Sequence, residues 1–416
     1  MIEHAHQNNT QRDSVVITGI GAVTPLGHSF DTITQSLLSG TSGIQSIDPG
    51  PFARDATQFA GAVGDIPVPA HSLTGMETTT FKSLPRLDQF CIGPVASALE
   101  DAALGSDRTT MRIGLILGLG AENLKAWEED YLHHGTQVFQ PSCRQTLAQQ
   151  LKSIFKLNGP AVTTAAACAS SGYAIALGRQ WIHAGWVDAC IVGGCDTLSP
   201  TSLAAFYNLR ALSRRTDNPT KASRPFDRDR DGFVMAEGGT FFILERFTSA
   251  RTRQARIYAE LAGIGMSSDA SHMVAPCTDP KQASRTISMA IDDAGICAKD
   301  VDYINAHAAG TPVGDAAEAG AIRMALGSHA DRTPVSSTKS MSGHLVSGAA
   351  AFEALACLAA IQQQSVPPTI NLDHPDEGCE LDHVPHEARS TRIQAAASNS
   401  FGFGGSNLCI VLRAAA

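Results

Sequence analysis

Two segments in opposite halves of the chain share one pattern, and this pattern constrains the fold more than any other feature. Residues 17–21 read ITGIG and residues 261–265 read LAGIG. An apolar, β-branched run that ends in glycines and is followed by helical periodicity is typical of a strand–helix unit. We therefore expect two comparable α/β halves related by internal duplication, rather than two unrelated domains.

The same reading predicts the other elements. Strands are expected at 14–21, 112–118, 188–194, 239–245, 261–265, 301–306, 395–398 and 408–413, and helices at 87–103, 172–184, 281–294, 315–325 and 343–363. The last helix is long and rich in alanine, as expected for a helix packed closely on several sides.

Composition excludes several classes of protein. Of the 416 residues, 43% are hydrophobic and 17% are charged, which provides a large core and excludes disordered, collagen-like and coiled-coil chains. This length corresponds to two or three domains of roughly 100–200 residues. The net charge of -9 argues against nonspecific binding to nucleic acid.

The ten cysteines are scattered and do not form the pattern of a metal site. No CxxC occurs, and Cys190 and Cys195 are the closest pair, so no zinc site of thiolates is expected. Residues 1–13 lack a signal sequence and are expected to form a flexible leader. No apolar run approaches the roughly 20 residues that span a bilayer. We therefore expect a reduced, cytoplasmic protein without membrane insertion.

The most charged segment is the loop-like stretch of residues 213–238. Its charges alternate in sign from Arg224 to Asp231, which favours a local network of ion pairs. We interpret the segment as structural rather than catalytic.

The first segment that can carry chemistry contains Cys168. Residues 165–173 read AAACASSGY and lead into a predicted helix. The positive end of a helix lowers the pKa of a thiol and favours the thiolate, and the neighbouring backbone amide can face an oxyanion. An inert buried cysteine is the alternative reading.

Two further segments place basic side chains at strand-to-helix turns. His307 follows a predicted strand in YINAHAAGTPVGD, and Lys339 and His344 follow another in VSSTKSMSGH. Such turns are where functional residues tend to lie. We expect the two histidines and the lysine to face one cavity together with Cys168.

The fourth segment is glycine-rich, with Phe401 and Phe403 in SNSFGFGGSN at residues 398–407. Glycines allow a close approach of the backbone and can expose amide donors for an oxyanion. Phe403 is a candidate gate, and a glycine turn with two core phenylalanines is the alternative.

Taken together, these segments resemble the condensing enzymes of the thiolase fold, and most closely the elongating β-ketoacyl-[acyl-carrier-protein] synthase II family of fatty acid and polyketide systems. The resemblance runs from Val15 to Asn407 and includes SRPFDRDRDGFV at 223–234, MSSDA at 266–270, VPPTINL at 366–372 and PDEGC at 375–379. It implies a five-layered α-β-α-β-α fold of two halves, residues 14–255 with the nucleophile and 256–416 with the catalytic histidines and lysine. It also implies a dimer.

The resemblance assigns a role to each matching residue. Cys168 matches the nucleophile that takes an acyl group from a carrier protein, and His307 and His344 match the pair that promotes decarboxylation of malonyl carrier and stabilises the enolate. Lys339 matches the lysine that organises the site. The supporting matches are Glu353 and Phe401, the oxyanion amides of Cys168 and Phe403, and the gate Phe403. No metal or organic cofactor is implied, since substrates arrive on the phosphopantetheine of an acyl carrier protein.

The chain departs from the family pattern around the pantetheine arm. The family usually has His-Gly-Thr-x-Thr, whereas this chain has Ala308 and Ala309 after His307 and keeps only Thr311. In the loop after Met266, Val274 and Ala275 replace Thr-Ser. Polar contacts to the arm are thus replaced by apolar groups, which puts ordinary carrier affinity in doubt.

Two other sets of residues are implied to contact substrate or carrier. Ala121 and Glu122 match the far end of the acyl pocket, where Ala121 is smaller than usual; we expect a longer tunnel and an acyl chain such as a polyene or polyketide. Lys82, Arg86 and Arg210 match a basic carrier-binding site, with ordinary solvated surface residues as the alternative reading.

Three alternative functions remain open. The chain is either an independent enzyme or a catalytic subunit that works only beside a partner resembling a chain-length factor. A noncatalytic scaffold that binds acyl carriers is a further alternative. A degradative thiolase is disfavoured, because that chemistry uses a second catalytic cysteine where this chain has SFGF from Ser400.

Overall fold

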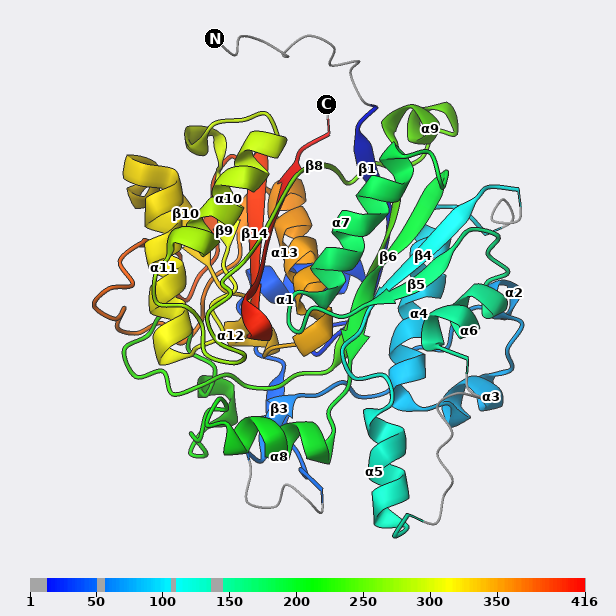
Figure 1. Ribbon diagram of the computed structural model, residues 1–416, viewed down its shortest axis with the longest axis horizontal. Coiled ribbons are helices and arrows are strands. Elements are labelled where there is room, and N and C mark those ends of the chain that lie inside the picture. The colour runs from blue at the N-terminus through cyan, green and yellow to red at the C-terminus, as the bar shows by residue number, and fades with distance from the viewer. Residues whose placement is uncertain (1–12, 51–56, 106–109, 136–144, 416) are drawn as a thin grey trace.

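The computed structural model describes residues 13–50, 57–105, 110–135 and 145–415 (Figure 1). The first twelve residues of the expected leader lie outside this part of the chain. The strands are β1 (Val15–Val23), β2 (Ile44–Ser46), β3 (Phe59–Gly61), β4 (Ile113–Gly118), β5 (Ala161–Thr164), β6 (Ala189–Asp196), β7 (Gly238–Arg246), β8 (Ala259–Ser268), β9 (Tyr303–Asn305), β10 (Pro334–Ser336), β11 (Ser365–Val366), β12 (Asp382–His383), β13 (Arg389–Ser390), β14 (Ala395–Gly402) and β15 (Ser406–Arg413).

The helices surround and separate two parts of the main sheet. They are α1 (Phe30–Leu38), α2 (His71–Thr74), α3 (Thr78–Ser83), α4 (Arg86–Asp101), α5 (Leu124–Leu132), α6 (Leu147–Ile154), α7 (Ser170–His183), α8 (Pro200–Asn208), α9 (Phe247–Thr252), α10 (Lys281–Asp293), α11 (Pro312–Leu326), α12 (Lys339–Ser342) and α13 (Ala349–Gln363).

The strand order repeats between the two halves of the chain. The main sheet has the order β12-β10-β9-β14-β15-β8-β1-β7-β6-β4-β5. The second half contributes one additional strand, β12, at the sheet edge. When the other five strands of each half are numbered along the chain and read from the sheet edge inward, both halves have the order third, second, fourth, fifth, first. The pairing directions also repeat: β4 is parallel to β5 and β6, as β9 is to β10 and β14. The other neighbours among these ten strands are antiparallel, and the additional strand β12 pairs in parallel with β10. The expected duplication is therefore confirmed in the topology.

The halves meet where β1 pairs with β8, at Val16 opposite Glu260. In Figure 1, α7 and α13 lie side by side at the centre, with α10 and α11 outside one part of the sheet and α4 and α6 outside the other. This arrangement is the expected five-layered α-β-α-β-α fold. The predicted boundary between the halves falls between α9 and β8.

Helix α13 explains why this fold needs so much alanine. Its residues from Ala349 to Ile361 are all buried, and it packs against α7 and against strands of both halves. Small side chains allow backbones to approach closely on every side of a central helix. The segment Val346–Gln363 is long and apolar enough to span a membrane, contrary to the sequence prediction, but 83% of it is buried inside the molecule.

The predicted start of this helix at residue 343 was wrong. Gly343 has φ +72° and ends α12, and a 3-10 turn at Val346–Gly348 precedes α13. The interruption turns the backbone so that His344 pairs with Met235 in a short bridge. Alanine periodicity alone does not reveal this break, which is where the site lies.

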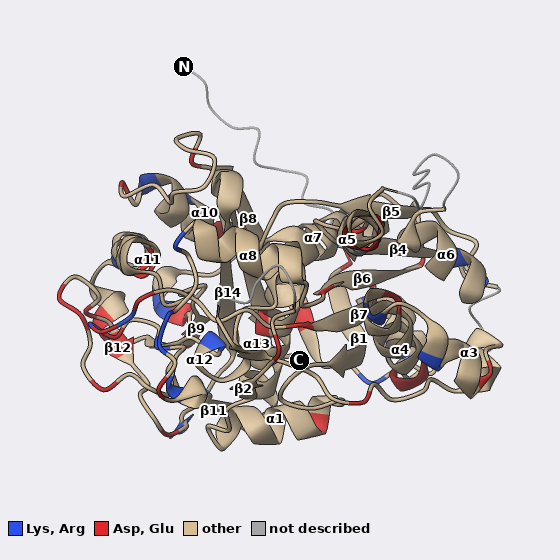
Figure 2. Ribbon diagram, turned by 90° about the horizontal axis from the view of Figure 1, so that it is seen from below, with Lys and Arg blue, Asp and Glu red and all other residues tan. Residues whose placement is uncertain are grey.

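The charged loop forms the predicted ion pairs. Arg224 lies 3.1 Å from Asp227 and 3.0 Å from Asp373, and Arg230 lies 2.7 Å from Asp376. Figure 2 shows basic and acidic segments interspersed around β9 and β12. Both arginine side chains are at least nine-tenths buried, and Arg230 also lies 3.7 Å from Asp315 on α11. The network therefore fixes this loop beside α11.

Candidate active site

Three reactive side chains from distant parts of the sequence meet at one point. The ligand atoms of Cys168, His307 and His344 all lie within 4.8 Å of one another. Cys168 precedes α7, His307 follows β9 and His344 follows α12. The rings of His307 and His344 are 5.4 Å apart and nearly perpendicular, at 83°. The sequence reasoning placed these residues in one cavity, and the structure brings them together.

A tight turn holds Cys168 in front of α7. Ala167 has φ +49°, and the Ser170 hydroxyl accepts from the backbone N–H of Ala166 at 2.9 Å and donates to the Ala167 carbonyl at 2.6 Å. Gly402 packs against this turn, where a Cβ would lie 2.9 Å from the Ala166 carbonyl oxygen. A glycine is therefore required at 402 for the next residue to reach the sulfur.

The backbone N–H of Phe403 lies close enough to the Cys168 sulfur to act against the rise in the pKa of this thiol, which places the amide near the reactive atom. The Phe403 ring lies 6.0 Å from the ring of Phe206. The amide thus has the position that an oxyanion donor requires, and the ring lies at the cavity wall where a gate would act.

The expectation of a lowered thiol pKa was wrong for the resting protein. Burial raises the pKa of Cys168 to about 11, although the charge of Lys339 and the Phe403 N–H act in the opposite direction. Cys168 is only 8% exposed, and a buried anion loses its hydration. The charge of Lys339 and the Phe403 N–H do not outweigh this cost, so the group is mainly a thiol at neutral pH.

Lys339 positions His307 through contacts with its ring and its backbone carbonyl. Its Nζ lies 3.4 Å from His307 Nδ1 and 2.5 Å from the His307 carbonyl oxygen, and it forms a buried ion pair with Glu353. The side chains of Lys339 and Glu353 are 2% and 1% exposed. An ammonium group only donates, so His307 Nδ1 accepts and its proton sits on Nε2.

Both imidazoles are neutral at physiological pH. Burial, followed by the charge of Lys339, holds the pKa values of His307 and His344 well below the ordinary range. The nitrogen–proton bonds of these rings are therefore available as hydrogen-bond donors rather than as strong acids. Burial raises the pKa of Glu353 to about 6 even though Lys339 opposes the shift.

His344 is held mainly by its backbone. Its N–H donates to the Val234 carbonyl at 2.7 Å, and its carbonyl accepts from Ala236 at 2.9 Å. The ring lies 5.3 Å from that of Phe233. Among the described residues, its buried Nδ1 has no hydrogen-bond partner, so its tautomer is not fixed as that of His307 is.

Sequence reasoning missed two carboxylates that hold the turn after β9. Glu318 accepts from the backbone N–H groups of His307 at 2.8 Å and Ala308 at 2.6 Å, and Asp315 accepts from those of Gly310 and Thr311 at 3.1 Å each. Burial raises the pKa of Glu318 to about 7 and that of Asp315 to about 6. The sequence signal that could have revealed this role was the presence of two acidic residues three positions apart on an alanine-rich helix.

A cavity of about 550 Å³ leads from the surface to these groups. Leu209, Met273 and Val313, at its outer part, are 50%, 79% and 49% exposed. The residues that the sequence analysis placed around the pantetheine arm line it as well, namely Val274, Ala275, Ala308, Ala309 and Thr311. The predicted carrier-binding residue Arg210 and the supporting residue Phe401 also line this cavity.

The residues predicted for the acyl pocket lie elsewhere. Neither Ala121 nor Glu122 lines this cavity. Ala121 is exposed, whereas Glu122 accepts from the Leu147 N–H at 2.5 Å and so caps α6. Their role in chain length stays a prediction.

The three predicted carrier-binding cations have different surroundings. Lys82 on α3 and Arg210 are exposed. Arg86 instead forms an ion pair of 2.6 Å with Glu237, whose side chain is 4% exposed. Arg86 therefore stabilises the fold, and its availability to a carrier is reduced.

Comparison with known proteins agrees with this geometry. The family models described as beta-ketoacyl synthase, N-terminal domain, and beta-ketoacyl synthase, C-terminal domain, match residues 12–250 and 258–373. The 3-oxoacyl-[acyl-carrier-protein] synthase 2 of Synechocystis sp. is 39% identical, over 97% of this chain and 99% of the relative.

Two solved structures are also similar. A type II polyketide acyl-carrier protein in complex with its ketosynthase gives a TM-score of 0.86 at 31% identity, and the ishigamide ketosynthase/chain length factor gives 0.86 at 29%. Each comparison covers 97% of this chain and 100% of the matched chain.

Proposed function

Because this chain belongs to the beta-ketoacyl synthase family, we propose that it joins an acyl group carried on Cys168 to malonyl-[acyl-carrier protein] with loss of CO2. The product is a β-ketoacyl carrier two carbons longer. The protein is thus an acyltransferase of fatty acid or polyketide synthesis.

The meeting of one thiol and two neutral imidazoles within 4.8 Å carries this proposal. Cysteine and histidine are also zinc ligands. However, the Lys339 ammonium lies 3.4 Å from His307 Nδ1, and a second cation beside it would be repelled. The set suits nucleophilic catalysis better than metal binding, and the steps below need no cofactor.

The first step is acyl transfer. A neutral imidazole, for which His344 is suited because its tautomer is not fixed, takes the Cys168 proton as the sulfur attacks the carrier thioester. The carbonyl electrons move to oxygen, which the N–H groups of Cys168 and Phe403 stabilise. Collapse breaks the bond to the carrier sulfur, and the proton passes to that leaving thiolate.

The second step is decarboxylation. The malonyl thioester oxygen accepts hydrogen bonds from His307 Nε2–H and from the ring of His344. Cleavage of the carbon–carboxylate bond releases CO2 and leaves its electron pair in the enolate. Neutral donors suit this step, because they stabilise the developing oxyanion without protonating the carbon that must react.

The third step is condensation. The enolate carbon attacks the acyl carbonyl on Cys168, and a new carbon–carbon bond forms. Collapse of the tetrahedral oxyanion breaks the bond to Cys168 and returns its electron pair to sulfur. One proton from water restores the thiol, so the cycle consumes one proton and releases one CO2.

The carrier protein must sit at the outer part of the cavity, because the arm has to reach Cys168 through it. Three of the exposed side chains there are apolar, namely Leu209, Met273 and Val313, and Arg210 adds one cation. This surface supports docking by apolar contact with a single charge–charge contact, in keeping with the loss of hydroxyls along the arm.

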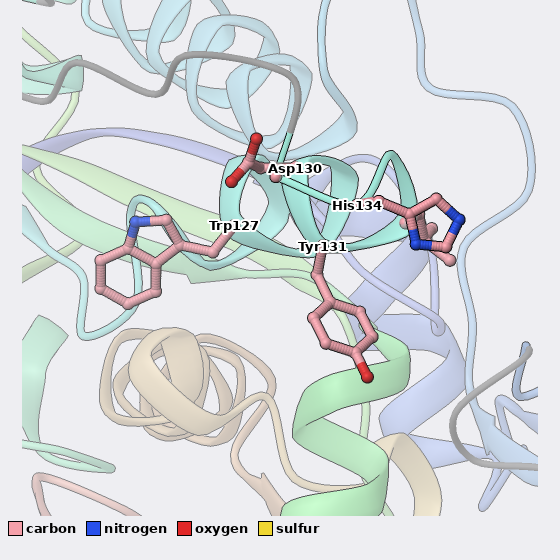
Figure 3. Close-up of a pocket in the computed structure, with 6 residues that line it drawn as sticks. Trp127, Asp130, Tyr131 and His134 are labelled. Atoms are coloured by element: carbon pink, nitrogen blue, oxygen red, sulfur yellow. The ribbon is translucent and has the colours of Figure 1, made fainter.

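We propose that the protein works as a homodimer. Among the described strands, β5 forms one end of the main sheet and β12 the other, and no described strand pairs with the outer edge of β5. On α5, Trp127 and Tyr131 are 56% and 71% exposed, and Figure 3 shows both rings extending away from the helix axis. Large exposed aromatic side chains of this kind favour a protein contact.

A heterodimer with a subunit resembling a chain-length factor is the alternative assembly. The similarity of this chain to the ishigamide ketosynthase/chain length factor supports the heterodimer as an alternative. Because Cys168, His307 and His344 are all present, this chain would be the catalytic subunit. We place the reaction in the cytoplasm, in agreement with the nine described cysteines, all of which are free.

The test is to incubate the purified chain with a panel of acyl carriers and to follow its intact mass. We expect one acyl group per chain in the wild type and in Cys277→Ala, the matched control, because Cys277 lines the same cavity. Cys168→Ala should not be acylated. Failure with every carrier, with and without candidate partner subunits, would support a noncatalytic scaffold.

A further inference from the structure

A second cavity, of about 360 Å³, opens at the other end of the strands that carry the catalytic residues. Its wall includes Asp302 and Thr333, which precede β9 and β10. His307 and Lys339 follow the same two strands. The two cavities share no lining residue, so this one does not belong to the active site.

Four cationic side chains line the second cavity, namely Lys299, Arg332, Arg389 and Arg392. Arg389 forms an ion pair of 2.8 Å with Asp382. Within the part of the chain that the structure describes, Lys299, Arg332 and Arg392 are exposed and have no ion-pair or hydrogen-bond partner for their side chains.

The two acidic residues in the wall are already engaged. Asp302 accepts from the backbone N–H groups of Gln394 at 2.7 Å and Ala395 at 3.1 Å, and Asp382 is bound by Arg389. The formal charge of the wall is therefore positive, although the chain as a whole carries -9. Unpaired like charges around one hollow repel one another, and a bound anion would relieve that repulsion.

We propose that this cavity binds a small phosphorylated ligand with at least two negative charges. Guanidinium groups match phosphate oxygens in geometry and charge. A volume of 360 Å³ lies at the lower end of the range for small-molecule sites. A concave site of this size takes a compact phosphate compound more readily than the convex surface of an acidic protein.

The test is calorimetric titration of the full-length protein with inorganic phosphate, diphosphate and ADP. We expect diphosphate to bind about tenfold or more tightly than phosphate, since it engages more of the unpaired cations. If ADP and diphosphate bind with equal affinity, the site recognises phosphate groups alone. If ADP binds with higher affinity than diphosphate, the site recognises a nucleotide. Either result supports the proposal.

The matched variants are Arg332→Ala/Arg392→Ala and the control Arg251→Ala/Arg285→Ala, which removes two exposed arginines outside the cavity. The first should weaken diphosphate binding about tenfold or more, and the control should not change it. Condensing activity and unfolding midpoint should be unchanged in both. Equal affinities of the two double variants for diphosphate would overturn the proposal. So would the absence of saturable binding of any of the three phosphate compounds, or binding of an acidic carrier protein instead of a phosphate compound.

Discussion

The buried pair of Lys339 and Glu353 gives the most informative perturbation, because it separates folding from catalysis. Lys339→Met removes the cation that donates to His307 and leaves Glu353 without a counter-ion in a site that is 1% exposed. Breaking a buried ion pair by removing one partner costs about 3–5 kcal/mol of unfolding free energy. The single variant should therefore be both unstable and inactive in condensation.

The double variant Lys339→Met/Glu353→Gln distinguishes the two effects. Its core is neutral, and Gln at 353 can still accept the hydrogen bond that Ser400 donates at 3.2 Å. Replacement of a buried ion pair by neutral side chains is often tolerated. The double variant should therefore regain most of the about 3–5 kcal/mol of unfolding free energy that the single variant loses. Condensation should stay reduced by about 10²–10³-fold, because His307 has lost the donor that sets its tautomer.

The assays are urea unfolding and single-turnover release of CO2 from malonyl carrier by enzyme already acylated on Cys168. Acylation itself should fall less than CO2 release, since Lys339 donates directly to His307. Recovery of CO2 release in the stable double variant would refute the role of the Lys339 charge. Full stability of the single variant would refute the buried pair itself.

Three further predictions address neighbouring features. The rate of Cys168 alkylation by iodoacetamide should keep rising as the pH increases toward its pKa of about 11, because only the thiolate reacts; a plateau near neutral pH would contradict the dominance of burial. Gly402→Ala should lower acylation about tenfold or more, because a Cβ would lie 2.9 Å from the Ala166 carbonyl oxygen, and an unchanged acylation rate in the folded variant would count against this contact. Met273→Asp should raise the KM for acyl carriers but not for acyl pantetheine, whereas Met289→Asp, an exposed control outside the cavity, should change neither.

The sequence predicts the architecture well because the strands are marked by local signals. Apolar β-branched runs between glycines identify β1, β4, β6, β7 and β8 within a few residues. The duplicated strand order requires long-range pairing, which no local pattern encodes. The short echo of ITGIG and LAGIG only indicates it.

The site was predictable in its residues but not in its electrostatics. The positions of Cys168, His307 and His344 after strands or before a helix are local features. The pKa of Cys168 depends on burial, which arises only when α7, β14 and the turn after α12 pack together. Reasoning from the helix end alone therefore gave the wrong direction.

The residues that support the site were harder to predict from the sequence, because their partners become neighbours only in the folded chain. Glu318 acts through backbone N–H groups eleven and ten residues before it, and sequence shows only an acid in an alanine-rich helix. Arg86 matched a carrier-binding position, yet it pairs with Glu237. A surface role for a cation cannot be assigned without knowing which acids the fold brings to it.

Condensation on Cys168 is tested most directly by a single turnover with carbon-13-labelled malonyl carrier and enzyme acylated beforehand. The account predicts labelled CO2 and a β-ketoacyl carrier that contains the unlabelled acyl group and two labelled carbons, with loss of both in His307→Ala. Loss of the acyl group to water, or labelled CO2 without the longer product, would contradict it.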